Sequence, residues 1–411
     1  MRIAVITSSY PRFPGDGTAP FVKSICEHLV KASHQVDVVA PYDQEIKPIE
    51  TNGVGLYRFK YIWPDHLHIL GHARSLKNDS KLHPLSFFLL PFFLLSAFWN
   101  LLRITSKQKS QVIYAHWVIP NGLVAAWVSI VRGIPFILSL HGSDIFVAEK
   151  NFLFSACARW IFRHASFVTA CSPELFQSAI SMGARDKTSV IAWGADPAIF
   201  YPGRRELSKS NRLEIPDATL VIATLGRMVQ KKGFDILLET FPAILRAEPR
   251  TKLIIGGDGV LKNELQSQVS RLGITNNVTC PGSLHWNEVP DFLAQADIFV
   301  LPSVRDPNGN LDGLPTVLLE AMSSGCAIVA SNIGGVSLVI ENEKNGLLVP
   351  PGSVDALTNA ILDLISDHQK RILFGRSARQ SVIDRHNWVE VTKKISDILA
   401  EAVEISNKLK S

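Results

Sequence analysis

Cysteine is scarce in this chain and follows no recognisable pattern. The 411 residues include only five cysteines, and no two of them form a Cys-x-x-Cys pair. The number is odd and all five lie in apolar stretches, so neither a disulfide framework nor a zinc site is expected. The cysteine content favours a reducing compartment, and we expect the protein to be cytoplasmic.

Several motifs that hold metal ions or phosphates are missing as well. The sequence contains no Asp-x-Asp, no His-Glu-x-x-His and no Walker-type phosphate loop. A diphosphate held by a metal ion is therefore not expected, and neither a metal nor another cofactor is predicted. The first residues, MRIAVITSSYP, have too short an apolar core for a signal peptide and predict a first β-strand.

Charge of one sign is not in large excess. The formal net charge is +5 and the sequence pI is near 8.9, a bias too mild to indicate nucleic-acid binding. It suits phosphate-bearing substrates or an anionic membrane surface. Hydrophobic residues make up 46% and the mean hydropathy is +0.15, which excludes wholesale disorder.

Strand-like and helix-like segments alternate along the chain, which is typical of parallel sheets covered by helices. Strands are predicted at 2–7, 36–40, 55–60, 111–115, 135–140, 167–170 and 188–191, and again at 219–225, 252–256, 277–280, 297–301, 326–330 and 346–349. The polar, proline-bearing stretch 202–218 separates the two series. We therefore expect an α/β protein of two doubly wound, Rossmann-like domains facing a cleft, with domains 1–201 and 219–385, linker 202–218, and a final helical segment 386–411.

The loop that follows the first strand of the second domain carries positive charge. The segment 225-LGRMVQKKGFDILLETF-241 contains Arg227, Lys231 and Lys232 between a buried-looking strand and a helix. Basic side chains at such a loop can hold a diphosphate while backbone N–H groups hold it from the other side. Ligands of open parallel sheets lie at the carboxyl ends of the strands, where this loop is placed.

A second segment, 301-LPSVRDPNGNLDGLPTVLLEAMSSGCAIVAS-331, brings an acidic pair to the same edge. Asp312 is followed by a turn of small residues and then by a helix that contains Glu320. The turn consists of Gly313, Leu314, Pro315 and Thr316. A helix N-terminus favours a phosphate, and a carboxylate one turn further along can accept hydrogen bonds from two vicinal hydroxyls, as in a ribose. The alternative is that Asp312 only starts a turn and Glu320 is a solvated helix residue.

Together these segments resemble the retaining GT-B-type glycosyltransferases of the "group 1" (glycosyltransferase family four-like) family. The resembling pattern is Gly-Arg at Gly226–Arg227, Lys-Gly at Lys232–Gly233, and the acidic-x7-Glu segment that ends at Glu320. The resemblance implies that Arg227 and Lys232 bind the donor diphosphate, that Glu320 binds the ribose, and that Asp312 binds the donor sugar. Gly226 and the turn from Gly313 to Thr316 are expected to contact the donor as well. Asp312 replaces the Glu usual in the family, which bears on donor preference.

The first domain carries two further candidate sites. Gly15 and Gly17 open a loop after the first strand, where glycines let the backbone approach a phosphate or a sugar. His141, at the end of the strand in 137-ILSLHGSDIF-146, can hydrogen-bond a sugar hydroxyl. The resemblance implies a donor contact for both the glycine loop and His141. His116 and Trp117 also follow a strand, and either packing or a place in an acceptor pocket fits them.

The resemblance implies a retaining, metal-independent hexosyltransferase that uses a nucleoside diphosphate sugar. The acceptor would be a glycan or a polyprenyl-linked sugar in cell-surface polysaccharide synthesis. Domain 1–201 would then bind the acceptor and domain 219–385 the donor, and the segment 386–411 would return to the first domain. Two alternatives stay open: a nucleotide sugar epimerase or sugar phosphorylase on the same fold, and a non-catalytic nucleotide sugar-binding subunit.

One apolar run stands apart from these motifs. The segment 84-PLSFFLLPFFLLSAFWNLL-102 has no charge and is apolar on nearly every face, so it must be buried somewhere. Pro91 interrupts it and predicted strands of one sheet flank it, which argues against a membrane span. A core helix and a helix laid on the bilayer remain. We expect it to pack by one face and to expose Phe and Leu on the other, at the inner face of an anionic membrane.

Overall fold

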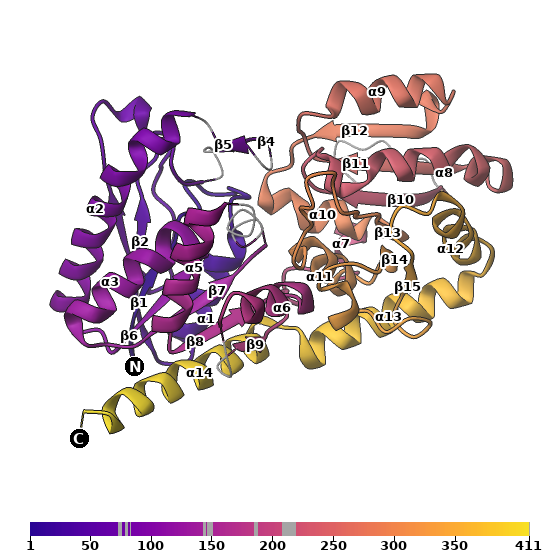
Figure 1. Ribbon diagram of the computed structural model, residues 1–411. Helices are drawn as coiled ribbons and strands as arrows, with labels where there is room; N and C mark the ends of the chain where they lie inside the picture. Colours follow the sequence, from indigo (N-terminus) through magenta and orange to yellow (C-terminus); the bar gives the residue numbers. More distant parts are fainter. Residues whose placement is uncertain are drawn as a thin grey trace. The chain divides into compact units, whose positions relative to one another are not determined.

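The protein folds into two compact units, each built around a parallel sheet (Figure 1). The computed structural model describes residues 1–72, 76–78, 81–82, 84–142, 145, 151–184, 188–207 and 219–410. One unit comprises Met1–Ile191 with Trp388–Ser411, and the other comprises Ala192–Asn387. The prediction of two doubly wound, Rossmann-like α/β domains is confirmed.

The first unit contains a seven-stranded sheet in the order β3-β2-β1-β6-β7-β8-β9, and all described neighbouring pairs are parallel. Its strands are β1 (Arg2–Ile6), β2 (Gln35–Pro41), β3 (Gly55–Phe59), β6 (Val112–His116), β7 (Phe136–Leu140), β8 (Phe167–Ala170) and β9 (Thr188–Val190). Its helices are α1 (Pro20–Lys31), α2 (Pro84–Lys107), α3 (Leu123–Arg132), α5 (Phe152–His164), α6 (Pro173–Ser181) and α14 (Trp388–Lys408). A small hairpin is formed by β4 (Leu76–Asn78) and β5 (Lys81–Leu82).

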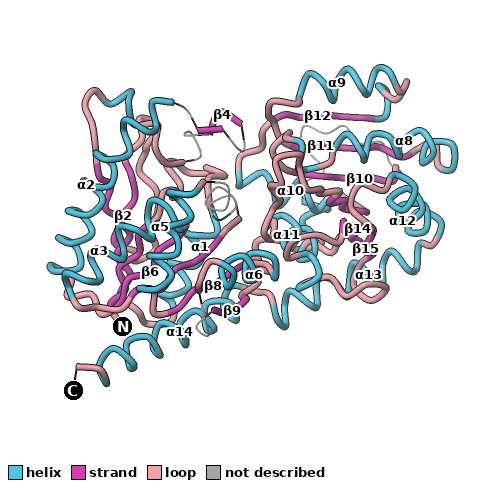
Figure 2. Tube along the Cα trace, viewed as in Figure 1, coloured by secondary structure: helices cyan, strands magenta, loops and turns pink. Residues whose placement is uncertain are grey.

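The second unit contains a six-stranded parallel sheet in the order β12-β11-β10-β13-β14-β15. Its strands are β10 (Leu220–Leu225), β11 (Thr251–Gly256), β12 (Val278–Gly282), β13 (Ile298–Leu301), β14 (Ala327–Ser331) and β15 (Leu347–Val349). Its helices are α7 (Arg204–Leu207), α8 (Phe234–Ala247), α9 (Lys262–Arg271), α10 (Val289–Ala294), α11 (Thr316–Ser323), α12 (Val354–Ser366) and α13 (His368–Arg385). Figure 2 shows helices and strands alternating along the trace within each unit.

Both sheets reverse their strand order at a defined point. The first strand of each sheet, β1 or β10, lies between the strand that follows it in sequence and a strand from later in the chain. The central strands are buried along nearly their whole length, which explains why they consist of continuous apolar runs. In open parallel sheets a ligand binds at the carboxyl ends of the strands beside such a reversal. The candidate residues of each unit should therefore be sought there.

The boundary between the units lies earlier than the sequence suggested. The segment 192–201 was expected in the first domain but belongs to the second unit. The carbonyl oxygen of Phe200 accepts hydrogen bonds from the Ser323 hydroxyl at 2.8 Å and from Arg379 at 2.9 Å, which ties this segment to α11 and α13. Ion pairs join Arg204 to Asp291 and Arg205 to Asp297, so the start of the expected linker packs on the same unit. The rest of that linker, 208–218, lies outside the described residues.

Helix α2 packs by one face only, as expected from the sequence. Its stretch Leu85–Lys107 is long and apolar enough to span a membrane: its 18-residue window has a mean hydropathy of 1.9, and 28% of that window is buried. Its buried side chains include Leu89, Phe93, Ala97 and Leu101, and its exposed large apolar side chains are Phe87, Phe88, Phe92, Leu95 and Trp99. The exposed residues recur about every four positions, so they form one stripe along the helix.

Candidate active site

The loops that follow β10 and β11 touch through their backbones. The N–H of Gly226 donates to the carbonyl oxygen of Gly256 at 3.0 Å, and the N–H of Met228 donates to Asp258 at 2.8 Å. Gly257 has a φ of +125°, and a Cβ at this position would overlap the carbonyl oxygen of Gly226. Only glycine meets both conditions, because L side chains disfavour this φ and no space is left for a methyl group. Gly226, predicted to bind the donor, therefore lies in a tightly packed turn.

Two consecutive lysines from this loop reach a carboxylate that follows β13. Lys231 and Lys232 end the 3-10 helix η3 (Gln230–Lys232), and Gly233 is the N-terminal cap of α8. The Lys231 Nζ lies 3.1 Å from one Asp312 oxygen, and the Lys232 Nζ lies 2.6 Å from the other. The structure thus brings the predicted residues Lys232 and Asp312 together at the point where the sheet order reverses. Arg227 is exposed on the same loop.

The electrostatics of Asp312 follow from this geometry. Burial pushes the pKa of its carboxyl group up, but the adjacent Lys232 and Lys231 ammonium groups outweigh burial and hold the pKa well below its ordinary value. Asp312 is therefore a carboxylate at every pH near neutrality. A fixed carboxylate can accept hydrogen bonds from sugar hydroxyls but cannot act as a proton donor.

Glu320 is in the opposite electrostatic situation. It lies on α11, and its exposed fraction is 9%. Burial raises the pKa of its carboxyl group to about 8, and no side-chain hydrogen bond or ion pair of Glu320 occurs within the described part of the chain. A buried carboxyl group without a donor favours its neutral form. Hydrogen-bond donors brought by a ligand would reverse that preference, which fits the predicted ribose contact.

The turn between these two acidic residues is fixed by backbone contacts. The N–H of Gly335 donates to the carbonyl oxygen of Gly313 at 2.5 Å, and Leu314 is buried. Pro315 is the N-terminal cap of α11, and no side chain caps the helix. The N–H groups of the first turn, from Thr316 onward, therefore lack a side-chain acceptor and remain suited to an anion.

In the first unit, the predicted His141 lies beside His116. The two imidazoles are joined by a hydrogen bond of 3.1 Å between His116 Nδ1 and His141 Nε2, and the Trp117 ring lies 4.5 Å from the His141 ring. Burial lowers the pKa of His116 to about 3, and burial together with His116 lowers the pKa of His141 well below its ordinary value. Both rings are therefore neutral, and each can donate one hydrogen bond and accept one. His116 is the last residue of β6 and His141 directly follows β7, so both lie at the carboxyl edge of the sheet.

The glycine loop after β1 is held by a residue that lies between its two glycines. Asp16 pairs with Arg12 at 2.7 Å and accepts a hydrogen bond from the N–H of Thr18 at 3.0 Å. Burial would raise the pKa of Asp16, but the hydrogen bonds from Arg12 and Thr18 lower it to about 2. Gly15 has a φ of +82°, whereas a Cβ at Gly17 would meet no atom within 4 Å. Gly15 thus serves the turn, and Gly17 borders open space.

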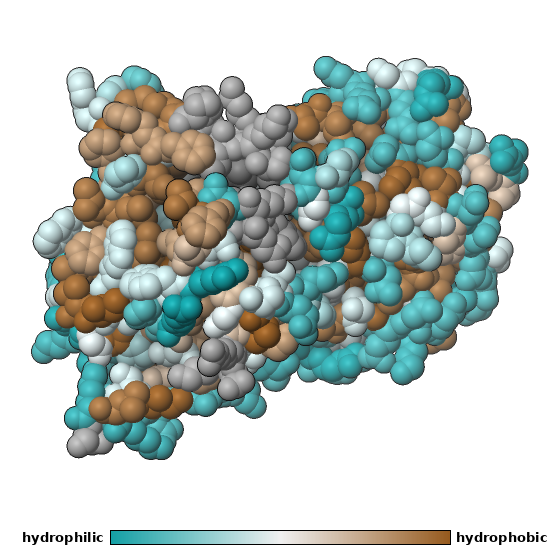
Figure 3. All heavy atoms as spheres, viewed as in Figure 1, coloured by the Kyte–Doolittle hydropathy of each residue, from teal (hydrophilic) through white to brown (hydrophobic). Residues whose placement is uncertain are grey.

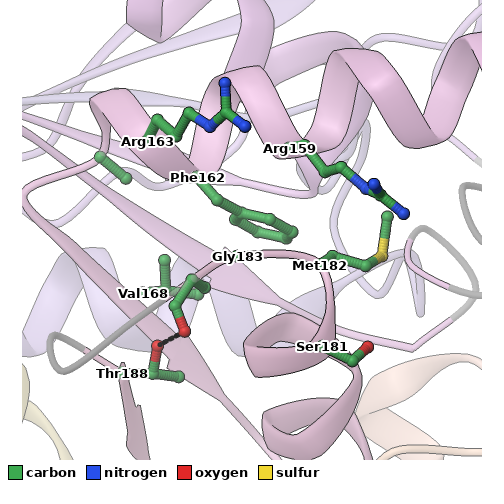
Figure 4. A pocket seen from close by; sticks show the side chains of 10 residues that line it. Arg159, Phe162, Arg163, Val168, Ser181, Met182, Gly183 and Thr188 are labelled. Carbon is green, nitrogen blue, oxygen red and sulfur yellow. Dashed lines mark hydrogen bonds between the residues drawn. The ribbon is translucent and has the colours of Figure 1, made fainter.

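A cavity in the first unit lies away from these residues. It has a volume of about 570 Å³ and is lined by parts of α5, the end of α6 and the starts of β8 and β9. Figure 4 shows Arg159 and Arg163 from α5 beside the Phe162 ring, with Met182 next to them. Because it lies where β8 and β9 begin, this cavity is at the amino edge of the sheet and His141 is at the opposite, carboxyl edge. It is not part of the candidate site.

Sequence reasoning assigned no role to several residues that the structure places in these sites. Lys231 was recognised only as part of a basic loop, and its contact with Asp312 depends on a segment some eighty positions further along the chain. The pairing of His116 with His141 was also missed, although both follow strands that proved to be neighbours. Within the described residues, no group of three or more His, Cys, Asp or Glu side chains is arranged to hold a metal ion.

Comparisons with known proteins identify similar families for both parts of the chain. Residues 206–381 match the family model described as glycosyl transferases group 1, and residues 16–194 match the model of a glycosyl transferase 4-like domain. A GDP-mannose-dependent alpha-(1-6)-phosphatidylinositol monomannoside mannosyltransferase of Mycobacterium tuberculosis is 27% identical over 72% of this chain and 77% of its own. A putative teichuronic acid biosynthesis glycosyltransferase of Bacillus subtilis is 29% identical over 88% of each chain.

A solved structure extends the likeness to the fold. The Anabaena protein HepE in complex with UDP-glucose superimposes with a TM-score of 0.72 and 22% identity, covering 98% of this chain and 100% of the other.

Proposed function

The chain belongs to the group 1 glycosyltransferases, and from this premise we propose that it is a retaining, metal-independent hexosyltransferase of cell-surface polysaccharide or glycolipid synthesis. The donor would be a nucleoside diphosphate sugar, and the acceptor a glycan or a polyprenyl-linked sugar. The observation that carries the proposal is the lysine pair held against Asp312 at the reversal point of the second sheet. The relatives that bind GDP-mannose and UDP-glucose support a nucleotide sugar but leave base and sugar to experiment.

The proposed chemistry depends on stabilising the departing diphosphate. As the bond between the sugar and the diphosphate breaks, negative charge grows on the phosphate oxygens. Arg227, Lys232 and the uncapped N-terminus of α11 supply positive charge and N–H donors for these oxygens. Three such elements can neutralise a diphosphate without a metal ion. In the second unit, Asp312 would hold the sugar hydroxyls and Glu320 the ribose. In the first unit, the neutral His141 would offer a hydrogen bond to a sugar.

Retention of configuration is tested directly by the product. The purified protein is incubated with a nucleoside diphosphate sugar and an acceptor, and the anomeric proton signal of the product is recorded by NMR early in the reaction. We expect the anomeric configuration of the donor. An inverted product would contradict retention, and conversion of the donor sugar in the absence of acceptor would indicate an epimerase instead.

The donor is identified by a panel of nucleoside diphosphate sugars in a thermal unfolding assay. A ligand that binds only the folded state raises its stability with the logarithm of its saturation, so the true donor should raise the melting temperature at micromolar concentrations. UDP-glucose and GDP-mannose are tested first, because a similar solved structure contains UDP-glucose and a relative is GDP-mannose-dependent. If no nucleoside diphosphate sugar shifts the melting temperature or supports transfer, the proposal is wrong.

We further propose that the acceptor lies in a membrane and that the protein binds peripherally to the cytoplasmic face of this membrane. Exposed apolar side chains from three segments of the first unit gather at the carboxyl edge of its sheet: Trp63 after β3, Phe87 and Phe88 at the start of α2, and Phe152 and Leu153 at the start of α5. Their exposed fractions range from 57% to 84%. Brown side chains cover the region of α2 in Figure 3. His141 follows β7 at the same edge of this sheet, so an acceptor head group bound at this surface would lie on the His141 side of the first unit.

The basic residues near the end of α2 contribute little to this surface. Arg103, Lys107 and Lys109 are exposed, but Lys107 lies about 28 Å along the helix from Phe88 at 1.5 Å per residue. The side chains of Lys77 and Lys81 lie outside the described residues. Membrane binding should therefore depend mainly on the aromatic side chains, which insert at the level of the lipid head groups.

Vesicle flotation tests this part of the proposal. The wild-type protein should float with vesicles that contain phosphatidylglycerol, and a variant carrying Phe87→Ser and Phe88→Ser should float several-fold less. Leu373→Ser is the matched control, because Leu373 is also 60% exposed but lies on α13 of the second unit. A wild-type protein that stays in the soluble fraction with every vesicle, or a control variant that loses as much binding, would contradict membrane contact.

A further inference from the structure

The Lys232 ammonium group has two competing partners, Asp312 and the proposed donor diphosphate. Its Nζ lies 2.6 Å from Asp312, yet the proposed function requires the same ammonium group to bind the donor diphosphate. Its stem lies over Gly226, so that the charged end faces the loop that also carries Arg227. A diphosphate carries more charge than one carboxylate and accepts short, charge-assisted hydrogen bonds, so it competes with Asp312 for Lys232.

Lys231 is placed differently. Its side chain is 7% exposed, against 12% for Lys232, and its backbone carbonyl oxygen accepts a hydrogen bond from the N–H of Val304 at 2.9 Å. It is thereby fixed to the segment after β13, the same connection that carries Asp312. Its Nζ contacts the Asp312 oxygen that Lys232 does not contact. A buried ammonium group is strongly destabilised without a carboxylate, so Lys231 and Asp312 depend on each other.

We propose that Lys231 is a positioning residue that holds the Asp312 carboxylate in place when the donor diphosphate takes Lys232. This inference rests on the proposed function, in which Lys232 binds the diphosphate and Asp312 binds the sugar. With Lys231 in place, the carboxylate keeps one cation and its orientation during the exchange. Without Lys231, Asp312 would be left as a buried carboxylate whose last partner had been drawn to the phosphates. The sugar would then lose its hydrogen-bond acceptor, while the diphosphate would still be bound.

The prediction separates sugar contacts from diphosphate contacts. Lys231→Met should lower kcat by about 10- to 100-fold, as expected for loss of a charge-assisted hydrogen bond. Its Kd for the free nucleoside diphosphate should stay within about threefold of wild type. Lys232→Met should instead raise the Kd for the free nucleoside diphosphate by about tenfold or more. Lys231→Arg keeps the charge and should restore most of kcat, and Lys344→Met, which removes an exposed lysine paired with Glu341, is the matched control.

A double-mutant cycle tests whether Lys231 acts through Asp312. If it does, Lys231→Met should reduce kcat little further in an Asp312→Asn background. In Lys231→Met without donor, the Asp312 carboxylate keeps Lys232 as its partner, so this variant should remain folded. Melting curves of all variants check this before kcat is compared, and Lys231→Arg keeps the test valid if Lys231→Met folds poorly.

The outcomes distinguish the two proposals. If the wild-type protein transfers sugar and Lys231→Met has the same kcat, the role of Lys231 is wrong and the proposed function still holds. Equal losses of nucleoside diphosphate affinity in both lysine variants would also overturn it, by making Lys231 a phosphate ligand. Wild-type protein that neither binds nor uses any nucleoside diphosphate sugar would contradict both proposals.

Discussion

Donor binding should release a proton from Glu320. The pKa of this buried carboxyl group is raised to about 8, so at pH 7 it is about nine-tenths protonated in the free protein. The proposed contact with two ribose hydroxyls requires the carboxylate, because only the ionised form accepts from both hydroxyls with both oxygens free. The perturbation that isolates this group is Glu320→Gln, which keeps the shape of the side chain and removes its titration.

The magnitude follows from the strength of the new hydrogen bonds. Two bonds to a carboxylate contribute about 1.5–3 kcal/mol each, and one pKa unit corresponds to about 1.36 kcal/mol, so the pKa of Glu320 should fall by about two units or more in the complex. At pH 7 the protein would then release about 0.8 proton for each donor bound. The sign is fixed: the complex binds fewer protons than the free protein, so affinity increases with pH. Between pH 6 and pH 8 the Kd for the donor should decrease by roughly 25-fold.

Isothermal titration calorimetry measures the release. The apparent binding enthalpy at pH 7 is determined in buffers with different ionisation enthalpies, and the slope gives the number of protons exchanged. A nucleoside diphosphate sugar is used as the ligand, because its phosphates do not titrate near neutrality. Glu320→Gln should bind more weakly and show a slope near zero. A zero slope in the wild-type protein, or an unchanged slope in Glu320→Gln, would refute the assignment of Glu320 to the ribose.

Three further predictions concern other parts of the site. Arg227→Ala and Lys232→Ala should each lower kcat/KM by roughly two orders of magnitude, measured by initial rates, and wild-type values in either variant would contradict the diphosphate assignment. Gly257→Ala should lower the melting temperature far more than Gly273→Ala, because both have positive φ but only Gly257 has a carbonyl oxygen where the methyl group must go. Burial lowers the pKa of His116 to about 3, and the pKa of His141 is lowered as well. A plot of kcat against pH from 5 to 9 should therefore show no change that fits the titration of a histidine near pH 6.5. A change there that disappears in His116→Asn would show that the pair does take up a proton.

The strands of both parallel sheets could be predicted from the sequence. Strands such as β10, β11 and β13 are buried on both faces, so they appear as short, continuous apolar runs that end in glycine or polar residues. The edge of the sheet at which the candidate residues lie could also be predicted from the sequence around each of them. A residue that directly follows a strand lies at the carboxyl edge of a parallel sheet whatever the details of packing. Arg227, Lys232 and His141 could be assigned to that edge for this reason.

The sequence could not place the boundary between the units or choose the exposed face of α2. Residues 192–201 look like a continuation of the first domain, and only their hydrogen bonds to Ser323 and Arg379 assign them to the second unit. Helix α2 is apolar nearly all round, so its sequence contains no polar stripe to mark the outside. Contact with the sheet and with α3 decides that Phe93 is buried while Phe88 is exposed.

What the sequence by itself determined was the order of the elements and the edge at which each functional side chain lies, because both follow from interactions between residues close together in the chain. Only the tertiary structure decided which side chains meet. Lys231 and Asp312 lie in connections after different strands, and His116 and His141 lie at the carboxyl ends of two others. The opposite pKa shifts of Asp312 and Glu320 also depend on burial and on charges brought from elsewhere. The pKa of a carboxyl group in a protein depends on its burial and on nearby charges, which only the folded structure determines.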